Sequence, residues 1–112
     1  MQERFDAIWN KFCTLYPEIK EFEQPRVVFN GRLKSNAGRA IYMDNKIELS
    51  KKLFAENEEA FWGETIPHEF AHIVAHLIWG ASNITHHGKE WKSVMKAYGL
   101  EPRIYHDYVI TK

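Results

Sequence analysis

The sequence predicts a small α+β domain in which three main helices pack with a sheet of about three antiparallel strands. Three observations predict this class: an amphipathic segment opens the chain, short β-branched and aromatic runs follow, and two further helical patterns come after them. The chain has 112 residues, of which 45% are hydrophobic and 14% aromatic, and this composition suits one compact core. We therefore expect residues 1–112 to form a single domain.

Net charge and cysteine content exclude several classes of protein. The formal net charge is zero, so binding to a polyanion would require a local basic patch. The single cysteine, Cys13, allows neither an intrachain disulfide nor a cysteine-based zinc knuckle. The N-terminus lacks a signal-peptide pattern, and no apolar stretch approaches the roughly 18 residues of a membrane span. The sequence predicts a soluble, cytoplasmic protein without a membrane partner and leaves its oligomeric state open.

The N-terminal half is predicted to contain a helix, a loop and the sheet. Apolar residues recur at helical spacing over residues 3–16, and Pro17 ends that helix. Residues 17–25 hold two prolines and three glutamates and are predicted to form a loop. Asp44 and Asn45 tolerate positive φ and are predicted to form a tight hairpin turn. Three strands are predicted, at residues 27–29, 40–43 and 46–49.

The main helix is predicted in the second half of the chain. Ser50 is predicted to cap a short helical turn that precedes it. Apolar residues then recur over residues 60–78. Pro67 falls inside this pattern and cannot donate a helical hydrogen bond. We therefore expect either a kink near Gly63 or a new helix that starts at about Thr65.

The remainder of the chain predicts a loop, a last helix and a tail. Gly80 is predicted to end the main helix, and residues 80–86 to form a loop. The last helix is predicted over residues 88–98, with Gly99 closing it. Residues 105–110 are predicted to form a short strand or an extended segment.

A metal-binding motif lies in the main helix. Residues 68–72 read His-Glu-Phe-Ala-His, an H-E-x-x-H pattern. His68 and His72 are four residues apart, so both imidazoles lie on one helix face and can reach one ion. Glu69 can act as the base for a water bound to that ion. A catalytic zinc takes three protein ligands and one water, so a third ligand is required.

Four residues are candidates for the third ligand. His76 lies eight residues after His68, roughly 12 Å along the helix axis, which is too far for one ion. His86 and His87 follow a loop through which the chain can return to the site. Glu90 is also possible, because two histidines and a glutamate are an equally good zinc donor set. The spacing does not choose among the last three.

The motif and the segment His87-Gly88-Lys89-Glu90-Trp91 together resemble the signature of the SprT-like metalloprotease family, which includes the Spartan proteases. The likeness extends to Asn36-Ala37-Gly38-Arg39-Ala40, to Ile47-Glu48-Leu49-Ser50 and to Pro67, and covers roughly residues 26–106. It implies a zincin-like fold with one zinc ion per chain. It also implies His87 as the third ligand, with Glu90 as the fallback.

The resemblance departs from the family pattern at one point. Many members continue into a cysteine-rich zinc ribbon, whereas this chain has only Cys13. The chain is therefore expected to be a minimal form or a catalytic core. DNA contacts attributed to the ribbon do not carry over to it.

The predicted activity is that of a zinc-dependent endopeptidase acting on a protein or peptide substrate. Zinc would lower the pKa of its bound water towards about 7, and Glu69 would accept the proton and pass it to the leaving amine. A second donor for the developing oxyanion is usual, and Tyr105, His106 and Arg103 are candidates among which the sequence does not choose.

Two other functions stay open. The first is a non-proteolytic binding module stabilised by zinc, in which His76, His86 or Glu90 would supply a fourth ligand and close the site. The second is DNA binding, since Spartan-type proteases act on proteins crosslinked to DNA. The candidate DNA contacts are basic residues of the loop over residues 30–39 and of the last helix: Arg32, Lys34, Arg39, Lys89, Lys92 and Lys96.

Overall fold

The structure is a computed structural model, and it describes residues 1–80, 85 and 87–103. The fold is α+β, as predicted. In chain order the elements are α1 (Gln2–Leu15), the 3₁₀ turn η1 (Pro17–Glu21), β1 (Arg26–Asn30), β2 (Gly38–Ile41), the 3₁₀ turn η2 (Tyr42–Asp44), β3 (Lys46–Ser50), α2 (Lys51–Glu56), α3 (Glu58–Ala60), the π-helical turn η3 (Phe61–Thr65), α4 (Ile66–Trp79) and α5 (Lys89–Tyr98).

Helix α1 confirms the predicted amphipathic segment. Its apolar face is buried, and it packs against α4 and α5. The buried residues are Phe5, Ile8, Trp9, Phe12 and Cys13. The segment after it was predicted as a loop but begins with η1, a 3₁₀ turn that opens at Pro17 and buries Ile19. Proline suits the first turn of a helix because the N–H it lacks would have no partner there.

The sheet has three strands, as predicted, but it is mixed rather than antiparallel. The strand order is β1-β3-β2. Strands β2 and β3 are antiparallel, whereas β1 lies parallel to β3, with Val27 opposite Ile47 and Phe29 opposite Leu49. The prediction was wrong for β1 because side-chain alternation along a strand is the same for both directions of pairing. The connection between β1 and β3 contains β2 and is long enough to allow parallel pairing.

The turn between β2 and β3 differs in detail from the predicted hairpin. Strand β2 ends at Ile41, and the predicted strand residues Tyr42 and Met43 belong to η2. Asn45 is left-handed, with φ 48° and ψ 54°, as its residue type allows. Asp44 is not at positive φ. The Asn45 side-chain amide donates to the backbone oxygen of Glu23 over 2.9 Å and so joins this turn to the segment before β1.

Ser50 is the predicted N-cap of the short helix α2. Its Oγ accepts from the backbone N–H of Leu53 at 3.1 Å and donates to the backbone oxygen of Leu33 at 2.9 Å. Its own backbone N–H donates to the oxygen of Ala37 at 2.8 Å. Ser50 is fully buried, so these bonds fasten the loop over residues 31–37 to the end of β3.

The main helical region is continuous from α3 through η3 to α4. The prediction was a kink near Gly63 or a new helix at about Thr65; the structure instead has a π-helical turn that includes Gly63, after which α4 begins at Ile66. Pro67 is the second residue of α4 and follows the π-helical turn directly; in that turn the N–H of Ile66 donates to the backbone oxygen of Phe61. Gly80 ends α4 with φ 81°, as predicted, and its N–H donates to the oxygen of His76.

Helix α5 confirms the last predicted helix. It starts after Gly88 and ends at Gly99, which is left-handed with φ 108°. Trp91, Val94 and Met95 are fully buried. Most of the predicted loop over residues 80–86 and the extended segment over 105–110 lie outside the described residues.

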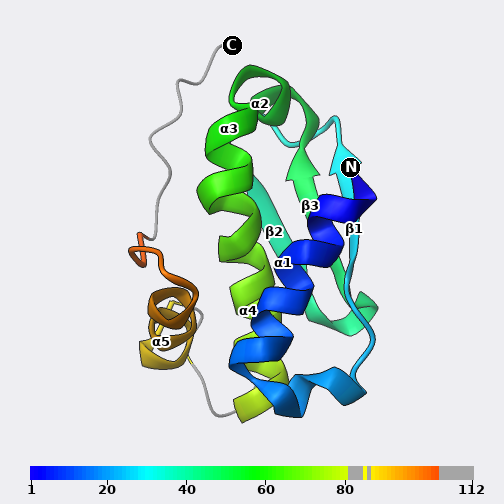
Figure 1. The fold of residues 1–112 in the computed structure, drawn as a ribbon. Helices are drawn as coiled ribbons and strands as arrows, with labels where there is room; N and C mark the ends of the chain where they lie inside the picture. The colour runs from blue at the N-terminus through cyan, green and yellow to red at the C-terminus, as the bar shows by residue number, and fades with distance from the viewer. Residues whose placement is uncertain (81–84, 86, 104–112) are drawn as a thin grey trace.

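Helix α4 is the centre of the molecule. Figure 1 shows the sheet on one side of α4 and α5 on the other. Helix α1 packs against both α4 and α5. Side chains from all these elements form one hydrophobic core, in which the largest fully buried members include Phe12, Phe61, Phe70 and Trp91. None of the described helices combines the length and the apolar composition that crossing a bilayer requires.

Candidate metal centre

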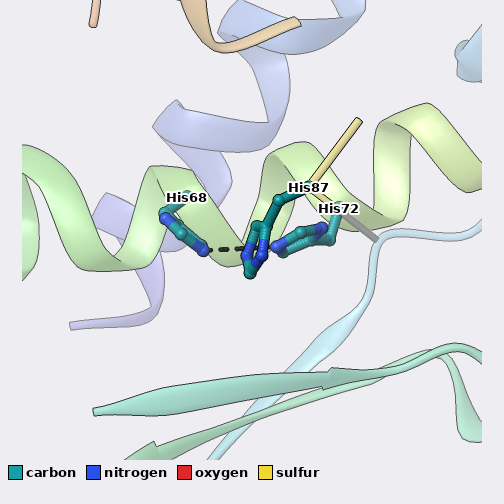
Figure 2. Close-up of side chains that lie close together, drawn as sticks. All are labelled: His68, His72 and His87. Carbon is teal, nitrogen blue, oxygen red and sulfur yellow. Dashed lines mark hydrogen bonds between the residues drawn. The ribbon is translucent and has the colours of Figure 1, made fainter. Parts of the chain in front are cut away.

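Three histidine side chains converge between α4 and the start of α5. Figure 2 shows His68 and His72 on α4 and His87 reaching them from the segment before α5. The Nε2 atoms of His68 and His72 are 3.2 Å apart, and one candidate ligand atom from each of the three residues lies within 4.8 Å of the others. A tetrahedral zinc with ligands at about 2.0–2.1 Å requires nitrogen atoms about 3.3 Å apart. The three side chains therefore fit a metal ion.

Local backbone geometry brings His87 to this place. Gly88 follows it and donates its N–H to the backbone oxygen of Thr85 over 3.0 Å. A Cβ at position 88 would lie 3.1 Å from both the Cβ and the backbone oxygen of Thr85. Glycine therefore permits the tight turn that starts α5 directly after His87.

Glu69 lies beside the three histidines and is almost completely buried. Its Oε2 atom is 3.8 Å from Nε2 of His68, and the residue is 6% exposed. Burial raises the pKa of Glu69 to about 8 in the metal-free chain, and the charge of a bound metal ion would lower it. Its Cγ packs so close to β2 that a Cβ on Gly38 would lie 3.3 Å from it. Glu69 is thus held where a carboxylate can reach a water bound by the three histidines.

The site opens into a pocket of about 430 Å³. One wall is formed by residues 35–40, which are β2 and the end of the loop before it, and the other by residues of η3 and α4. Arg103 closes the pocket on the side of α5, where its Nε and Nη2 atoms donate to the Glu64 carboxylate at 2.9 and 2.8 Å. The three histidines and Glu69 therefore line one pocket.

Of the predicted oxyanion donors, the structure describes only Arg103. It lines the pocket, and its guanidinium is paired with Glu64. Tyr105 and His106 lie outside the described residues. The role of each stays a prediction.

The other candidate ligands lie elsewhere or outside the described residues. The His76 ring stacks on Tyr42, with centroids 4.3 Å apart and planes 5° apart, and its buried Nδ1 has no hydrogen-bond partner among the described residues. Glu90 is 4.0 Å from the Lys89 ammonium. Within the described part of the chain, neither His76 nor Glu90 belongs to the metal-binding group. His86 is not described.

The basic residues predicted to contact DNA differ in their surroundings. Arg32 and Lys34 are exposed on the loop after β1, and neither forms an ion pair with another described residue. Arg39 is paired across the sheet with Glu48, its Nε donating to Oε1 at 2.5 Å. The structure brings Arg39 to the pocket wall.

Three residues near the site were not singled out for a site role in the sequence. Glu64 pairs with Arg103, Gly38 makes room for Glu69, and Trp91 contacts the three histidine rings. Sequence spacing contains part of this information, because Glu64 precedes His68 by one helical turn and Trp91 follows His87 by one turn. The contact of Gly38 with Glu69 joins two distant segments and leaves no local signal.

Known proteins that are similar to this chain point to one family. The family model of the SprT-like family matches residues 4–106. The protein named SprT of Vibrio atlanticus (strain LGP32) is 42% identical over 82% of this chain and 54% of its own length. Protein SprT of Vibrio parahaemolyticus serotype O3:K6 is 39% identical over the same shares of the two chains. Protein SprT of Pseudomonas putida (strain GB-1) is 34% identical over the whole of this chain and 66% of its own length.

The chain thus spans little more than half the length of the first two of these relatives. No solved structure matches it. The family match covers both the H-E-x-x-H helix and the segment that carries His87. The chain belongs to the SprT-like family.

Proposed function

We propose that this chain is the catalytic part of a zinc-dependent endopeptidase. The observation that carries the proposal is the convergence of His68, His72 and His87 beside the buried carboxyl group of Glu69, in a pocket open to a substrate. Membership of the SprT-like family supports a metallopeptidase role. Three described protein donors leave a fourth position for water, as catalytic zinc sites do.

Each residue then has a defined role. The three histidines would hold a zinc ion, which would lower the pKa of its bound water to about 7 and polarise the scissile carbonyl. Glu69 would act as the base that takes up a proton from the attacking water and passes it to the leaving amine. The low exposure of Glu69 keeps bulk water from competing for that proton.

The position of β2 supports a peptide as substrate. Among the described strands β2 is an edge strand, and Gly38, Arg39 and Ala40 line the pocket beside the histidines. An extended peptide can add to an edge strand through main-chain hydrogen bonds. This would place an extended peptide along β2, beside the three histidines.

Replacement of Glu69 by glutamine tests the proposed reaction. Glu69→Gln keeps the size of the side chain and removes the base, so we expect one zinc per chain and a peptidase rate lower by about 10²–10⁴-fold. The assay measures cleavage of casein and of the chain itself, with and without DNA. Glu90→Gln is the control and should keep full activity. A wild type that cleaves nothing in either condition, or an active Glu69→Gln, would exclude the proposal.

Metal analysis tests the ligand set separately from activity. We expect about one zinc per purified wild-type chain and a sharp loss in His87→Ala. Glu90→Gln should keep its zinc, because Glu90 lies outside the three-histidine group. A zinc content that survives in His87→Ala but falls in Glu90→Gln would assign the third place to Glu90. Zinc without any cleavage would favour the non-proteolytic binding module.

We propose DNA as a second partner on the position of two exposed cations. Arg32 and Lys34 lie on the loop that leads directly into the pocket wall at Ser35 and Asn36. A nucleic acid bound there would bring an attached protein to the pocket. The neutral formal charge of the whole chain makes any such binding local.

A titration with single-stranded DNA at two salt concentrations tests this partner. We expect weak binding that falls with salt and is lost in the double variant Arg32→Ala/Lys34→Ala. Lys20→Ala/Arg26→Ala removes the same charge elsewhere on the surface and should bind like the wild type. Absence of binding at low salt would contradict the proposal.

We also propose that the protein is cytoplasmic, since Cys13 is a buried free thiol that suits a reducing compartment.

A further inference from the structure

Trp91 contacts all three candidate metal ligands without being one of them. Its ring centroid lies 4.7 Å from that of His68, 5.1 Å from that of His72 and 4.9 Å from that of His87. The rings of Trp91 and His72 are nearly parallel, at 12°, while the other two meet the indole at 60° and 69°. The indole ring therefore packs against all three imidazole rings.

A hydrogen bond fixes the indole itself. Its Nε1–H donates to the backbone oxygen of His68 over 3.2 Å, from α5 to the first turn of α4. Trp91 is fully buried, so water cannot replace this bond. It lies four residues after His87, so the residue that anchors α5 to His68 also contacts the histidine that precedes α5.

Such contacts limit how the ligands can turn. The terminal torsion of a histidine side chain is broad, so an unsupported imidazole samples many orientations. An aromatic ring packed against it narrows that range, and groups that orient metal ligands commonly change metal affinity by about 10–100-fold when removed. One side chain here contacts all three ligands.

We propose that Trp91 is a positioning residue that pre-orients His68, His72 and His87 for the metal ion. This inference deepens the proposed metal site and depends on it. Trp91 touches neither the ion nor a substrate in this role; it acts through the three imidazoles. The contribution is made before metal binding, because the contacts are present in the chain alone.

Metal affinity measured on folded variants tests the inference. Trp91→Phe keeps an aromatic ring and loses the N–H donor, so we expect a Co²⁺ dissociation constant raised by about 10-fold. Trp91→Leu loses the ring as well, and we expect a rise of about 100-fold with a weaker tetrahedral absorption band of the bound Co²⁺. Val94→Ala is the control, since Val94 is fully buried one turn further along α5 and has no ring. It should lower thermal stability and leave the dissociation constant unchanged within twofold.

The outcomes separate this inference from the proposed function. A wild type that binds neither Co²⁺ nor Zn²⁺ would refute the metal site itself. A wild type that binds while Trp91→Leu binds equally well, with only the thermal stability lowered, would refute the role of Trp91 alone.

A measurement on the wild type tests the inference even if the Trp91 variants fail to fold. In the NMR spectrum of the metal-free chain, the ring protons of all three histidines should be shifted by the indole ring current. The ring protons of His76 should be shifted by the Tyr42 ring on which His76 stacks, and they should not respond to the replacement of Trp91. Ring protons of His68, His72 and His87 at the positions of free histidine would show that the indole does not hold them, and would overturn the inference.

Discussion

At the scale of single residues, Gly38 shows how the absence of a side chain can position the carboxyl group of a neighbouring residue. A Cβ there would lie 3.1 Å from the backbone oxygen of Glu48 and 3.3 Å from Cγ of Glu69. We predict that Gly38→Ala displaces the Glu69 side chain and lowers the peptidase rate by about 10–100-fold, because small misplacements of reacting groups are costly. Zinc affinity should stay unchanged, since the three histidines are not touched. Peptidase kinetics and Co²⁺ titration measure the two quantities.

Gly63 provides the matched control. A Cβ at this position would meet no atom within 4 Å, and the residue lies in the helical region. Gly63→Ala should keep full activity and raise the free energy of unfolding by up to about 1 kcal/mol, because alanine favours helix more than glycine does. A fully active Gly38→Ala would show that the Glu69 side chain does not depend on the space at residue 38.

At the scale of elements, Ser50 joins the end of β3 to both the loop before β2 and the start of α2. Its buried hydroxyl makes hydrogen bonds with Leu33 and Leu53. We predict that Ser50→Ala lowers the free energy of unfolding by about 1–2 kcal/mol, since it removes a helix cap and leaves the oxygen of Leu33 without its partner. Denaturant unfolding measures this. Thr14→Ala is the control, because that hydroxyl is exposed and bonds within its own helix; an equal loss there would contradict the role of Ser50.

The pairing of β2 with β3 predicts a pH dependence of stability. The hydrogen bond from Arg39, together with the charges of Arg39 and Lys46, holds the pKa of Glu48 below its ordinary value of 4.5. A pKa lowered in the folded state stabilises the fold above about pH 4.5, and that contribution is lost as the pH falls through the folded pKa. We predict that Glu48→Gln lowers the free energy of unfolding at pH 7 by about 0.2–1 kcal/mol.

Urea unfolding of both chains at a series of pH values from 7 down to 3 measures the difference. It should shrink below about pH 4.5 as the wild-type carboxylate takes up a proton. Glu56→Gln, which changes an exposed glutamate of α2, is the control for the loss of one negative charge. A difference between Glu48→Gln and wild type that is constant with pH would contradict the pairing.

The elements were predictable where the information is local. Helical periodicity predicted α1, α4 and α5. Ser50 predicted where α2 begins, and Gly80 and Gly99 predicted where α4 and α5 end. The direction of β1 was not predictable, because both directions of pairing share one alternation of side chains. The π-helical turn before Pro67 was expected only as an irregularity, since its hydrogen-bond pattern depends on how the segment packs.

The candidate site was also predictable only where the sequence information is local. His68, Glu69 and His72 followed from spacing along one helix. The sequence pattern alone left His86, His87 and Glu90 open, and resemblance to a family was needed to prefer His87, because a loop separates it from α4. The pairing of Glu64 with Arg103 and the packing of Gly38 against Glu69 are contacts between distant segments, and a single sequence does not record them.

At the scale of the whole molecule, the metal centre would tie α5 to α4. Two of its ligands come from α4 and the third precedes α5. A ligand that binds only the folded chain stabilises it by about 2.7 kcal/mol when its free concentration is 100 times its dissociation constant. For a domain of this size, that corresponds to a rise in Tm of roughly 10 °C or more. We predict that zinc raises the Tm of the wild type by this amount and that EDTA reverses it, as measured by calorimetry.

Variants of two histidines sharpen this test. His87→Ala should abolish the rise, because the ligand that joins the helices is gone. His76→Ala removes a histidine of α4 that lies outside the three-histidine group. The variant should have a lower Tm than the wild type, because the stack on Tyr42 is lost, but zinc should still raise its Tm. A zinc-dependent rise of normal size in His87→Ala would contradict the bridging of the two helices.

The central place of β3 has a consequence for the order of folding. Strand β2 reaches β3 through one short turn, whereas β1 pairs with β3 at a constant offset of 20 residues, Arg26 with Lys46. Closing the longer loop costs more chain entropy, so the antiparallel pair should form in the transition state and β1 should join after it. Asn45→Ala should therefore slow folding, and Val27→Ala should mainly speed unfolding, in stopped-flow measurements. The pocket wall would then be built before the strand that completes the sheet behind it.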